Sequence, residues 1–344
     1  MNSNVTVIVP AHNEAERITA TLNSVISQTY RPDEIIVVDD NSDDDTVNFA
    51  RKALRTNISW RVLSTIGGSK AKAQNAALPY VRTKYVIAID ADTILAKDAI
   101  EKIVEAMDRE HAVAASSWVM TQRQNTWVQK GRTIEYLFSF VWFKKVQNYY
   151  QRPLIASGCF NIYQTKVLRA IGGYPEDTLA EDMNATWEIY KRHLGRVLFV
   201  EDALAYTDDP EKLGQLKNQL ARWSCAYFQN YKKHHDDLMR EDWMAGFLLT
   251  TQMVNSVMGS IFYLIILGLF FVDPIFALLL LSVDICLIGV VASIGGKRFG
   301  LEKRVWLWIP SWFLVTVINS YYFLKYMMVT GMLNKSIKCY IKGH

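Results

Sequence analysis

Asp90 and Asp92 are the residues of this sequence whose type and spacing most directly suggest chemistry. They follow the apolar run 85–89, which has the composition of a buried strand. Two carboxylates this close disfavour each other's ionisation unless a cation compensates them. A hard divalent ion, Mg²⁺ or Mn²⁺, would do so, with water and substrate phosphates as its remaining ligands, and it would stabilise the charge of a departing diphosphate. A solvated turn is the simpler alternative.

Other polar clusters also follow short apolar runs. Residues 10–14 come after the run that begins at Val5, and Asp39 and Asp40 come after 34–38. For these two aspartates we favour ligand contact, whereas one of the aspartates at 43–45 is better explained as the N-cap of the next helix. Ligands of open α/β sheets bind outside the carboxyl ends of the strands, so we expect the clusters to converge on one pocket.

Strand-like and helix-like segments alternate along the first third of the chain. The β-branched and apolar runs predict strands over 5–10, 34–40, 60–64 and 85–90. Apolar residues at helical spacing predict helices over 14–28, 46–54, 70–78 and 97–110. This alternation predicts an α/β fold with a mainly parallel, Rossmann-like sheet covered on both faces. The sequence has neither a G-x-G-x-x-G fingerprint nor a P-loop motif, which disfavours dinucleotide and P-loop nucleotide sites.

Composition narrows the class of protein. The chain has 344 residues, half of them hydrophobic, and a formal net charge of +4. That charge is too small to suggest nucleic acid as a partner, and it suits an anionic membrane surface better. The four cysteines lie far apart, so we expect neither a zinc site nor a disulfide framework. The apolar run near the amino terminus is too short for a signal peptide.

An ordered series of motifs gives the sequence a resemblance to a known family. From Val5 to about Tyr231 the chain contains VIVPAHNE, VVDDNSDDDT, SKAKAQNAAL, AIDADT, SGCFNIYQTKVLRAIGGY, LAEDMNATWEIYKR and QLARW. It resembles family 2 glycosyltransferases with the GT-A fold, and more narrowly the membrane-integrated branch of hyaluronan, chitin, cellulose and poly-N-acetylglucosamine synthases. A single D-x-D would be weak evidence, whereas seven motifs in the family's order, ending in Q-x-x-R-W, are specific.

The resemblance implies a role for each matched residue. Asp182 would be the general base that deprotonates the acceptor hydroxyl for in-line attack with inversion, and Glu181 would help to place it. Asp92 and Asp90 would hold the metal, and Asp90 would also contact the nucleotide. The other residues implied to bind the nucleotide sugar are Pro10, Ala11, Asn13, Glu14, Asp39, Asp40, Lys70, Gln219, Arg222 and Trp223. Among these, Lys70 would lie near the diphosphate, and the Q-x-x-R-W residues would bind the diphosphate and close over the donor.

Each assignment has a structural alternative. Glu181 and Asp182 also suit the first turn of a helix, and Trp223 suits a helix at the membrane interface. The sequence departs from the family at Ala180, where relatives often have threonine, and both Lys70 and Lys72 fit the lysine position. Polysaccharide synthases also commonly carry membrane helices before the catalytic domain, and this sequence has none there.

Three apolar segments, at 247–272, 274–294 and 305–329, are long enough to cross a bilayer. Basic residues at 297–304 place the loop between the second and third segments, and with it the catalytic domain, in the cytoplasm. Lysines at 335–342 then conflict with the charge rule, so the third segment could also be re-entrant or interfacial. Asp284 lies midway along the second segment and would either line an acceptor path or bond a neighbouring helix. The aromatic stretch 133–150 is too charged to span, and we expect a helix at the membrane surface or the acceptor entrance.

These observations predict three regions, a cytosolic GT-A domain over 1–210, interfacial helices over 211–242 and a membrane region over 243–344. The predicted function is inverting transfer from a UDP-sugar (of the GlcNAc, Glc or GlcA type) to a growing β-linked polysaccharide. The alternatives are transfer of one sugar to a membrane lipid, such as a ceramide, diacylglycerol or polyprenyl phosphate, and a non-catalytic subunit that binds nucleotide sugars. Because three spans are few for an export channel, a homo-oligomer or an export partner would supply further helices.

Overall fold

The computed structural model describes residues 4–335, which divide into two compact units. The sheet unit contains the chain up to Gln122 together with Tyr150–Asp208, and the helical unit contains Arg123–Tyr149 and the chain from Asp209 onward. The domain boundaries expected near 210 and 243 stay a prediction, and the segment Arg123–Tyr149 is the part of the front half that groups with the helical unit.

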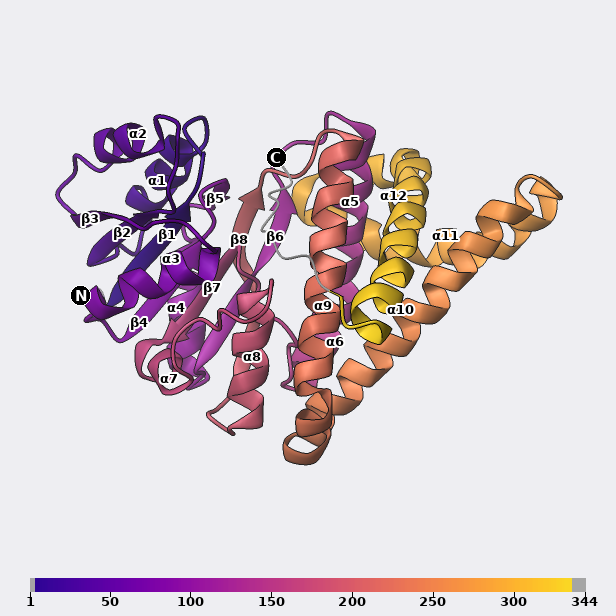
Figure 1. Ribbon diagram of the computed structural model, residues 1–344. Coiled ribbons are helices and arrows are strands. Elements are labelled where there is room, and N and C mark those ends of the chain that lie inside the picture. The colour runs from indigo at the N-terminus through magenta and orange to yellow at the C-terminus, as the bar shows by residue number, and fades with distance from the viewer. Residues whose placement is uncertain (1–3, 336–344) are drawn as a thin grey trace. The chain divides into compact units, whose positions relative to one another are not determined.

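The sheet unit contains one eight-stranded mixed sheet in the order β3-β2-β1-β4-β7-β6-β8-β5 (Figure 1). The strands are β1 (Val5–Ala11), β2 (Glu34–Asp39), β3 (Ser59–Ser64), β4 (Tyr85–Ile89), β5 (Thr93–Leu95), β6 (Ala114–Thr121), β7 (Phe160–Gln164) and β8 (Val197–Thr207). The first four strands pair in parallel, as the alternation of strands and helices predicts. Beyond β4 the sheet changes, because β7 pairs antiparallel with both β4 and β6, and β5 pairs antiparallel with β8. β6 and β8 pair in parallel again, so four of the seven strand pairings are parallel. The expectation of an α/β fold with a mainly parallel sheet is therefore confirmed.

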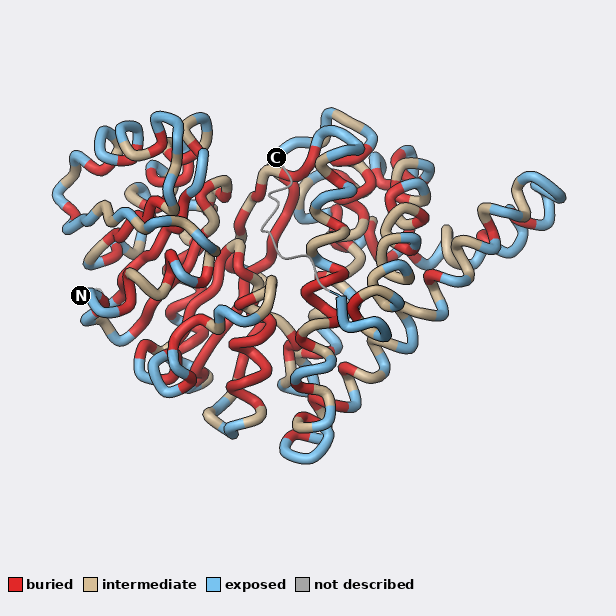
Figure 2. Tube along the Cα trace, in the orientation of Figure 1, coloured by how far each residue is buried: buried red, intermediate tan, exposed pale blue. Residues whose placement is uncertain are grey.

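Helices cover this sheet and begin close to where the sequence predicts them. The helices of the sheet unit are α1 (Ile18–Ile26), α2 (Thr46–Ala53), α3 (Lys70–Ala77), α4 (Ala99–Arg109), α7 (Thr165–Ala170) and α8 (Glu181–Lys191). A 3₁₀ turn, η1 (Leu78–Tyr80), follows α3 directly. Every residue of β1 and β4 is buried, as Figure 2 shows, because both faces of these central strands are covered.

Register brings the expected polar clusters to one edge of the sheet. Parallel pairing of β1 with β2 sets Ala11 level with Asp39. Antiparallel pairing of β4 with β7 sets Ile89 level with Phe160, so the chain entering β7 lies beside the chain leaving β4. Accordingly the amide of Asp90 donates to the carbonyl of Cys159.

The helical unit is built from long helices. They are α5 (Trp127–Ser139), the π-helical turn η2 (Phe140–Lys144), α6 (Lys145–Tyr149), α9 (Leu213–Glu241), α10 (Trp243–Leu269), α11 (Pro274–Gly296), η3 (Lys297–Phe299), α12 (Arg304–Tyr326) and the π-helical η4 (Met327–Met332). α5 packs closely on α12, since a Cβ added to Gly131 would lie 2.6 Å from a methyl group of Val315. The aromatic stretch expected at the membrane surface is thus a helix whose first half is buried against another helix of its own unit.

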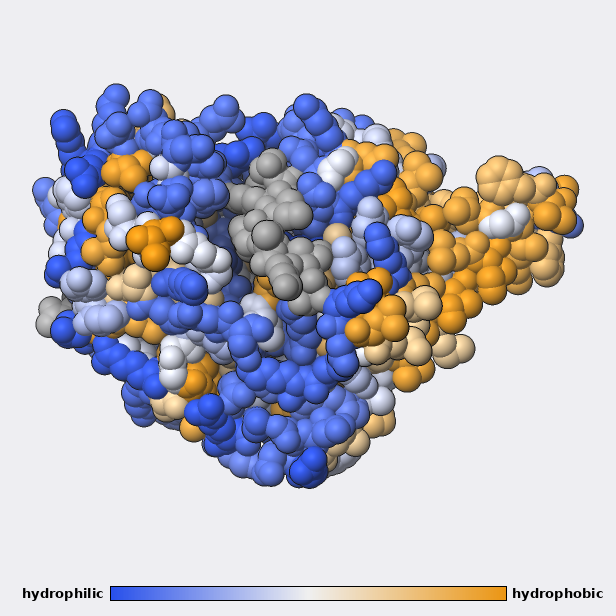
Figure 3. Space-filling model, in the orientation of Figure 1, coloured by the Kyte–Doolittle hydropathy of each residue, from blue (hydrophilic) through white to orange (hydrophobic). Residues whose placement is uncertain are grey.

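Three helical segments of the described chain are long and apolar enough to cross a membrane, Trp243–Leu269, Pro274–Phe299 and Arg304–Met332. Figure 3 shows hydrophobic residues gathered over α10 and α11. A short turn joins the first two, where the Asp273 carboxylate accepts the amide of Phe276 and Pro274 opens α11. The third segment is one continuous helix through Pro310. Most of the basic tail, residues 336–344, lies outside the described residues.

Asp284 on α11 accepts a hydrogen bond from the hydroxyl of Tyr263 on α10, at 3.2 Å. Tyr263 also packs its ring against Trp312 and Phe313 of α12. Of the two roles that the sequence leaves open for Asp284, the structure contains the bond to a neighbouring helix.

Candidate active site

A lysine ammonium lies among three carboxylates at the edge of the sheet. Lys70, the first residue of α3, places its Nζ 2.5 Å from Asp90 and 3.1 Å from Glu181. Its side chain is 17% exposed, so little water shares in its solvation. Ser69 caps α3 by accepting the amide of Lys72, and this fixes the helix start from which Lys70 extends. Lys72, the other lysine that fits the family position, is exposed.

This arrangement identifies a positive group that lies beside Asp90. Burial alone would lower the pKa of the Lys70 ammonium, but the three carboxylates outweigh that effect and raise the pKa well above its usual value. The lysine therefore stays charged over the whole physiological pH range. A fixed cation at this point suits an anionic ligand such as a diphosphate, as well as the carboxylates themselves.

Asp182 is held from two sides at the start of α8. Its Oδ2 accepts the amide of Gly158 and its Oδ1 accepts the amide of Met183, each at 2.7 Å. Burial, and then the neighbouring Glu181, raise the pKa of this carboxyl, while Lys70 and the two amides oppose the rise. A carboxylate with a raised pKa and a fixed orientation has the properties of a general base. The helix-start alternative also holds, since both acidic residues lie in the first turn.

Gly158 makes the close approach of these groups sterically feasible. A Cβ at this position would lie 2.7 Å from Nζ of Lys70 and 3.2 Å from Oδ2 of Asp182. Any side chain would therefore displace the ammonium or the carboxylate. The backbone of residue 158 runs directly against the charged cluster and donates its amide to it.

Tyr163 and Tyr174 are site residues to which the sequence analysis assigned no role. Their rings meet edge to face with centroids 6.0 Å apart, and both are almost fully buried. Burial raises the pKa of each phenol, and Glu181 raises both further, which places the two tyrosines close to the acidic pair. The motif containing Tyr163 and Tyr174 was part of the resemblance, but alternation along a strand cannot tell a tyrosine that faces the core from one that faces a site.

The expected uridine-binding residues lie on the loops after β1 and β2. Asp39 is 5% exposed and accepts the amide of Ser42, while Asp40 accepts the hydroxyl of Thr65 at 2.6 Å. Asn13 has a positive φ of 54° and its side chain accepts the amide of Asp43, which ties the two loops together. Pro10 and Ala11 end β1 itself.

Two further acidic residues in these loops have structural partners. Glu14 is 1% exposed, and its amide donates to the hydroxyl of Thr46. Asp45 occupies the N-cap position of α2 but makes no side-chain capping bond. Asp44 accepts the amide of Thr46 instead, so the stabilising carboxylate at this helix start comes one residue earlier than the cap position.

Asp90 and Asp92 offer oxygen ligands that fit Mg²⁺ or Mn²⁺. Both are partly exposed in the turn closed by the Thr93 amide on the carbonyl of Asp90. The described residues contain no group of three or more His, Cys, Asp or Glu arranged around a metal. Mg²⁺ typically binds through one or two carboxylates plus substrate phosphates, so the pair is sufficient. One oxygen of Asp90 bonds Lys70 at 2.5 Å.

The Q-x-x-R-W residues lie within about one turn of α9, in the helical unit. They are Gln219, Arg222 and Trp223. Trp223 is 40% exposed, and the guanidinium of Arg132 lies 4.8 Å from the centroid of its ring. Arg132 is itself 4% exposed and pairs with Glu135 and Asp209. The sequence analysis missed Arg132, because a single arginine in an aromatic helix carries no spacing signal.

Comparison with known proteins agrees with these features. Residues 6–172 match the family model described as "Glycosyl transferase family 2". The chain is 25% identical over 265 residues to a poly-beta-1,6-N-acetyl-D-glucosamine synthase of Staphylococcus aureus, covering 77% of this chain and 64% of the relative. A protein of the same name from Staphylococcus epidermidis is 25% identical over 240 residues, covering 70% and 56%. The chain thus spans less than two thirds of the length of these relatives.

Solved structures share the fold. A mannosyltransferase from Pyrobaculum calidifontis, in complex with GDP-Man and Mn²⁺, superposes with a TM-score of 0.60 at 20% identity and covers 93% of this chain and 87% of its own. Residues 1–349 of Staphylococcus aureus TarS, in complex with UDP-GlcNAc, give a TM-score of 0.52 at 17% identity and cover 95% and 92%. These likenesses show the GT-A fold expected from the sequence. The match to the family 2 glycosyltransferase model over residues 6–172 thus agrees with the fold that the structure shows.

Proposed function

We propose that the protein is a membrane-embedded, inverting glycosyltransferase that adds a sugar from a UDP-sugar donor to a growing β-linked polysaccharide. The observation that carries the proposal is Asp182, a buried carboxylate with a raised pKa that two backbone amides hold in place beside Lys70. The family 2 domain and the synthases named among the relatives supply the reaction class.

Asp182 would remove the proton from the acceptor hydroxyl as that oxygen attacks the anomeric carbon. A base is needed on this side because a neutral hydroxyl is a poor nucleophile. Glu181 would help by bonding Lys70, which keeps the ammonium between the two acidic residues and Asp90. Inversion follows from a single displacement in which no protein side chain bonds the sugar.

Charge on the leaving side would be balanced by Lys70 and by the metal site. Mg²⁺ or Mn²⁺ bound by Asp92 and Asp90 would supply Lewis-acid stabilisation of the departing diphosphate. Asp39, Asp40 and Asn13, with residues 10–14, would hold the uridine. We assign Gln219, Arg222 and Trp223 to the diphosphate and the donor, with Arg132 stacked on Trp223 to fix its ring.

The relatives favour a polymer over a lipid as the acceptor. The two staphylococcal relatives are named as synthases of a β-1,6-linked N-acetylglucosamine polymer, which also makes UDP-GlcNAc the first donor to test. The candidate spans would keep the enzyme in the bilayer. Lys297, Arg298, Lys303 and Arg304 support a cytoplasmic position for the loop before α12, and we place the catalytic domain on that side, where nucleotide sugars are made.

The test is the size distribution of the product formed by the full chain in membranes. The assay would supply a panel of UDP-sugars with Mn²⁺ or Mg²⁺ and would compare the wild type with Asp182→Asn and with Asp202→Asn, an exposed aspartate on β8. We expect a polymer ladder that Asp182→Asn abolishes and Asp202→Asn leaves intact, while UDP still binds to both variants. A single-sugar product that partitions into organic solvent would contradict the polymer acceptor, and near-normal transfer by Asp182→Asn would contradict the base.

A further inference from the structure

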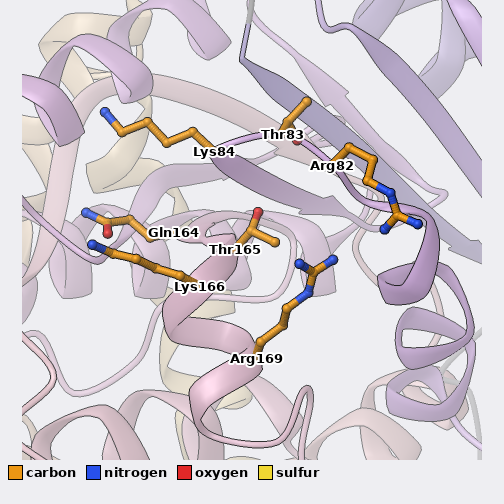
Figure 4. Close-up of a pocket in the computed structure, with 7 residues that line it drawn as sticks. All are labelled: Arg82, Thr83, Lys84, Gln164, Thr165, Lys166 and Arg169. Atoms are coloured by element: carbon orange, nitrogen blue, oxygen red, sulfur yellow. The ribbon is translucent and has the colours of Figure 1, made fainter.

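A second pocket in the sheet unit lies away from the acidic cluster. Its cavity volume is about 300 Å³, at the lower end of the range for small-molecule sites. Its lining side chains come from the loop before β4 and from the end of β7 with the start of α7 (Figure 4). They are Arg82, Thr83, Lys84, Gln164, Thr165, Lys166 and Arg169.

The register of the sheet separates this pocket from the candidate active site. Tyr85, the first residue of β4, pairs with Gln164, the last residue of β7, whereas Ile89 and Phe160 form the other end of the same pair. The pocket therefore lies at one end of the β4–β7 pair, and Asp90 lies just beyond the opposite end. Five strand residues at about 3.3 Å each separate the two sites by roughly 17 Å. A ligand in the pocket is thus distinct from the donor sugar.

The charge of the lining is strongly positive. Four of its seven residues are arginine or lysine, and the lining as described includes no carboxylate. Lys84 has a partner outside the lining, Asp108, at 2.5 Å. Within the described chain, Lys166 has no ion-pair partner, and its side chain is exposed. Like charges gathered around one cavity repel each other, and an anion there would relieve the repulsion.

The two arginines are already anchored by their neighbours. Nη2 of Arg169 donates to the carbonyls of Val81 at 2.7 Å and Leu78 at 3.2 Å, and Nη1 of Arg82 donates to the carbonyl of Pro79 at 2.6 Å. A guanidinium has five N–H donors in a planar fork, so these bonds orient each group without using all of its donors. An oriented guanidinium suits a phosphoryl oxygen pair.

Thr165 supplies an independent observation that favours a ligand in this pocket. It is 4% exposed, and its Oγ1 is a buried polar atom that has no hydrogen-bond partner within residues 4–335. A buried hydroxyl without a partner costs about 1–3 kcal/mol, so such atoms usually have one. Thr165 lines the same cavity as the four cations, and its hydroxyl would donate to an anionic oxygen bound there.

We propose that this pocket is a binding site for a phosphoryl anion, recognised by Arg82, Arg169, Lys166 and the hydroxyl of Thr165. The phosphoryl group could be free phosphate, the phosphate of a soluble metabolite or the headgroup of an anionic lipid, since all three present the same oxygens. The proposal is independent of the transfer reaction proposed above.

The first experiment measures binding of inorganic [³²P]phosphate by equilibrium dialysis to the full chain in phosphatidylcholine nanodiscs. It compares the wild type with Lys166→Glu, with Thr165→Val and with Lys52→Glu, a matched charge reversal at an exposed lysine on α2. We expect the pocket's phosphate to bind about tenfold more weakly in each pocket variant, the scale of one lost charge-assisted hydrogen bond, and to be unchanged in Lys52→Glu. The amount of phosphate bound at the candidate active site should be the same in all four proteins. Any difference in phosphate binding between them therefore reports on the pocket.

Thr165→Val keeps the shape of the side chain and removes a buried hydroxyl without a protein partner, so its melting temperature should be at least that of the wild type. Lys166→Glu changes an exposed side chain, which keeps the test valid if the valine variant folds poorly. Equal phosphate binding by wild type and Lys166→Glu, or no binding by the wild type, would overturn the proposal.

A second arm identifies the source of the phosphoryl group. The dialysis is repeated in nanodiscs that contain phosphatidylglycerol. Loss of the variant-sensitive phosphate binding in these discs, with binding retained in phosphatidylcholine, supports a lipid headgroup as the occupant. Binding that is unaffected by the anionic lipid supports a soluble phosphate. Either result requires the variant-sensitive binding seen in the first arm.

Discussion

Each unit of the protein buries a cation among carboxylates, and the two clusters differ in what completes them. In the sheet unit, Lys70 bonds Asp90 and Glu181, with Asp182 as a third acidic neighbour. In the helical unit, the guanidinium of Arg132 bonds two carboxylates and lies over the rings of Tyr136 and Trp223. Lys70 is thus one cation among three carboxylates, whereas Arg132 is one cation between two carboxylates and is covered by aromatic faces.

The difference separates a cluster suited to chemistry from a cluster suited to positioning. Burial, and then the neighbouring Glu181, raise the pKa of Asp182, which favours a group that can accept a proton. A guanidinium that is paired and stacked has no such freedom, and its planar fork instead fixes the groups around it. Substitutions around Lys70 should therefore act mainly on transfer, and substitutions around Arg132 mainly on stability.

Replacing Lys70 by glutamine should have the largest effect. The variant leaves three carboxylates without their ammonium, and breaking a buried ion pair typically costs about 3–5 kcal/mol of stability. Transfer should fall by about 10²–10³-fold, the usual loss for one group that stabilises developing charge. The measurement is the rate of sugar transfer in membranes, together with the melting temperature of the purified chain.

The pH profile distinguishes an electrostatic role from a structural one. Lys70 lowers the pKa of Asp182, so the acid limb of residual transfer by Lys70→Gln should move to higher pH. The matched control is Lys72→Gln, two residues along and exposed, which should keep both rate and profile. An unshifted acid limb in the Lys70 variant would show that this ammonium does not act on the base.

Gly158→Ala should reduce transfer by about 10²-fold, because displacing reacting groups by about 1 Å commonly costs that much. The added methyl would lie 2.7 Å from Nζ of Lys70, so the ammonium has to shift from its position among the carboxylates. Gly214→Ala on α9, where nothing lies within 4 Å of the new methyl, is the control and should keep full activity. Full activity of Gly158→Ala would mean that the cluster tolerates rearrangement.

Much of the fold could be predicted from the sequence because the central strands are buried on both faces. The runs that end at Pro10, Asp39 and Asp90 are apolar without alternation, and this is the signature of a parallel sheet under two layers of helices. The helix starts at Thr46 and Lys70 also agree with the pattern. The change to antiparallel pairing at β7 could not be read in this way, since strand direction depends on the path of the chain between strands.

The site could be predicted only where a residue type carries chemistry by itself. Asp90, Asp92 and Asp182 stand out as acids after strands or at a helix start, and Lys70 follows from the resemblance. The contributions of Gly158 and Tyr174 depend on close approach in space: one has no side chain, and the other looks like any core aromatic. Whether Gln219, Arg222 and Trp223 act on the donor stays a prediction.

Arg132→Lys should have a moderate effect that falls on stability more than on chemistry. A lysine keeps the charge but loses the planar contact with Tyr136 and Trp223, worth about 0.5–2 kcal/mol, and the forked bonds to Glu135 and Asp209. The melting temperature should drop by several degrees, while transfer at saturating donor falls less than about tenfold. Arg123→Lys, at an exposed arginine just before the same helix, should change neither quantity. Loss of transfer without loss of stability would place Arg132 in the reacting site and remove the contrast with Lys70.

The smallest effect expected is a pH-dependent gain in stability from Asp182→Asn, the variant that should be inactive. The pKa of Asp182 is raised above its usual 3.8 in the folded chain, mainly by burial and then by Glu181. The folded state therefore holds this proton more tightly than the unfolded state, so the carboxyl's contribution to stability is complete below about pH 4 and is lost as the pH rises through the folded pKa. Asparagine carries no titrating proton, and the variant should melt at an increasingly higher temperature relative to the wild type as the pH is raised from about 4 to 7. The difference should be of the order of 1 kcal/mol, the ordinary scale for one substitution. A difference in melting temperature that stays constant across that pH range would mean that the surroundings of Asp182 do not raise its pKa. The carboxylates around Lys70 would then be as well compensated as those around Arg132.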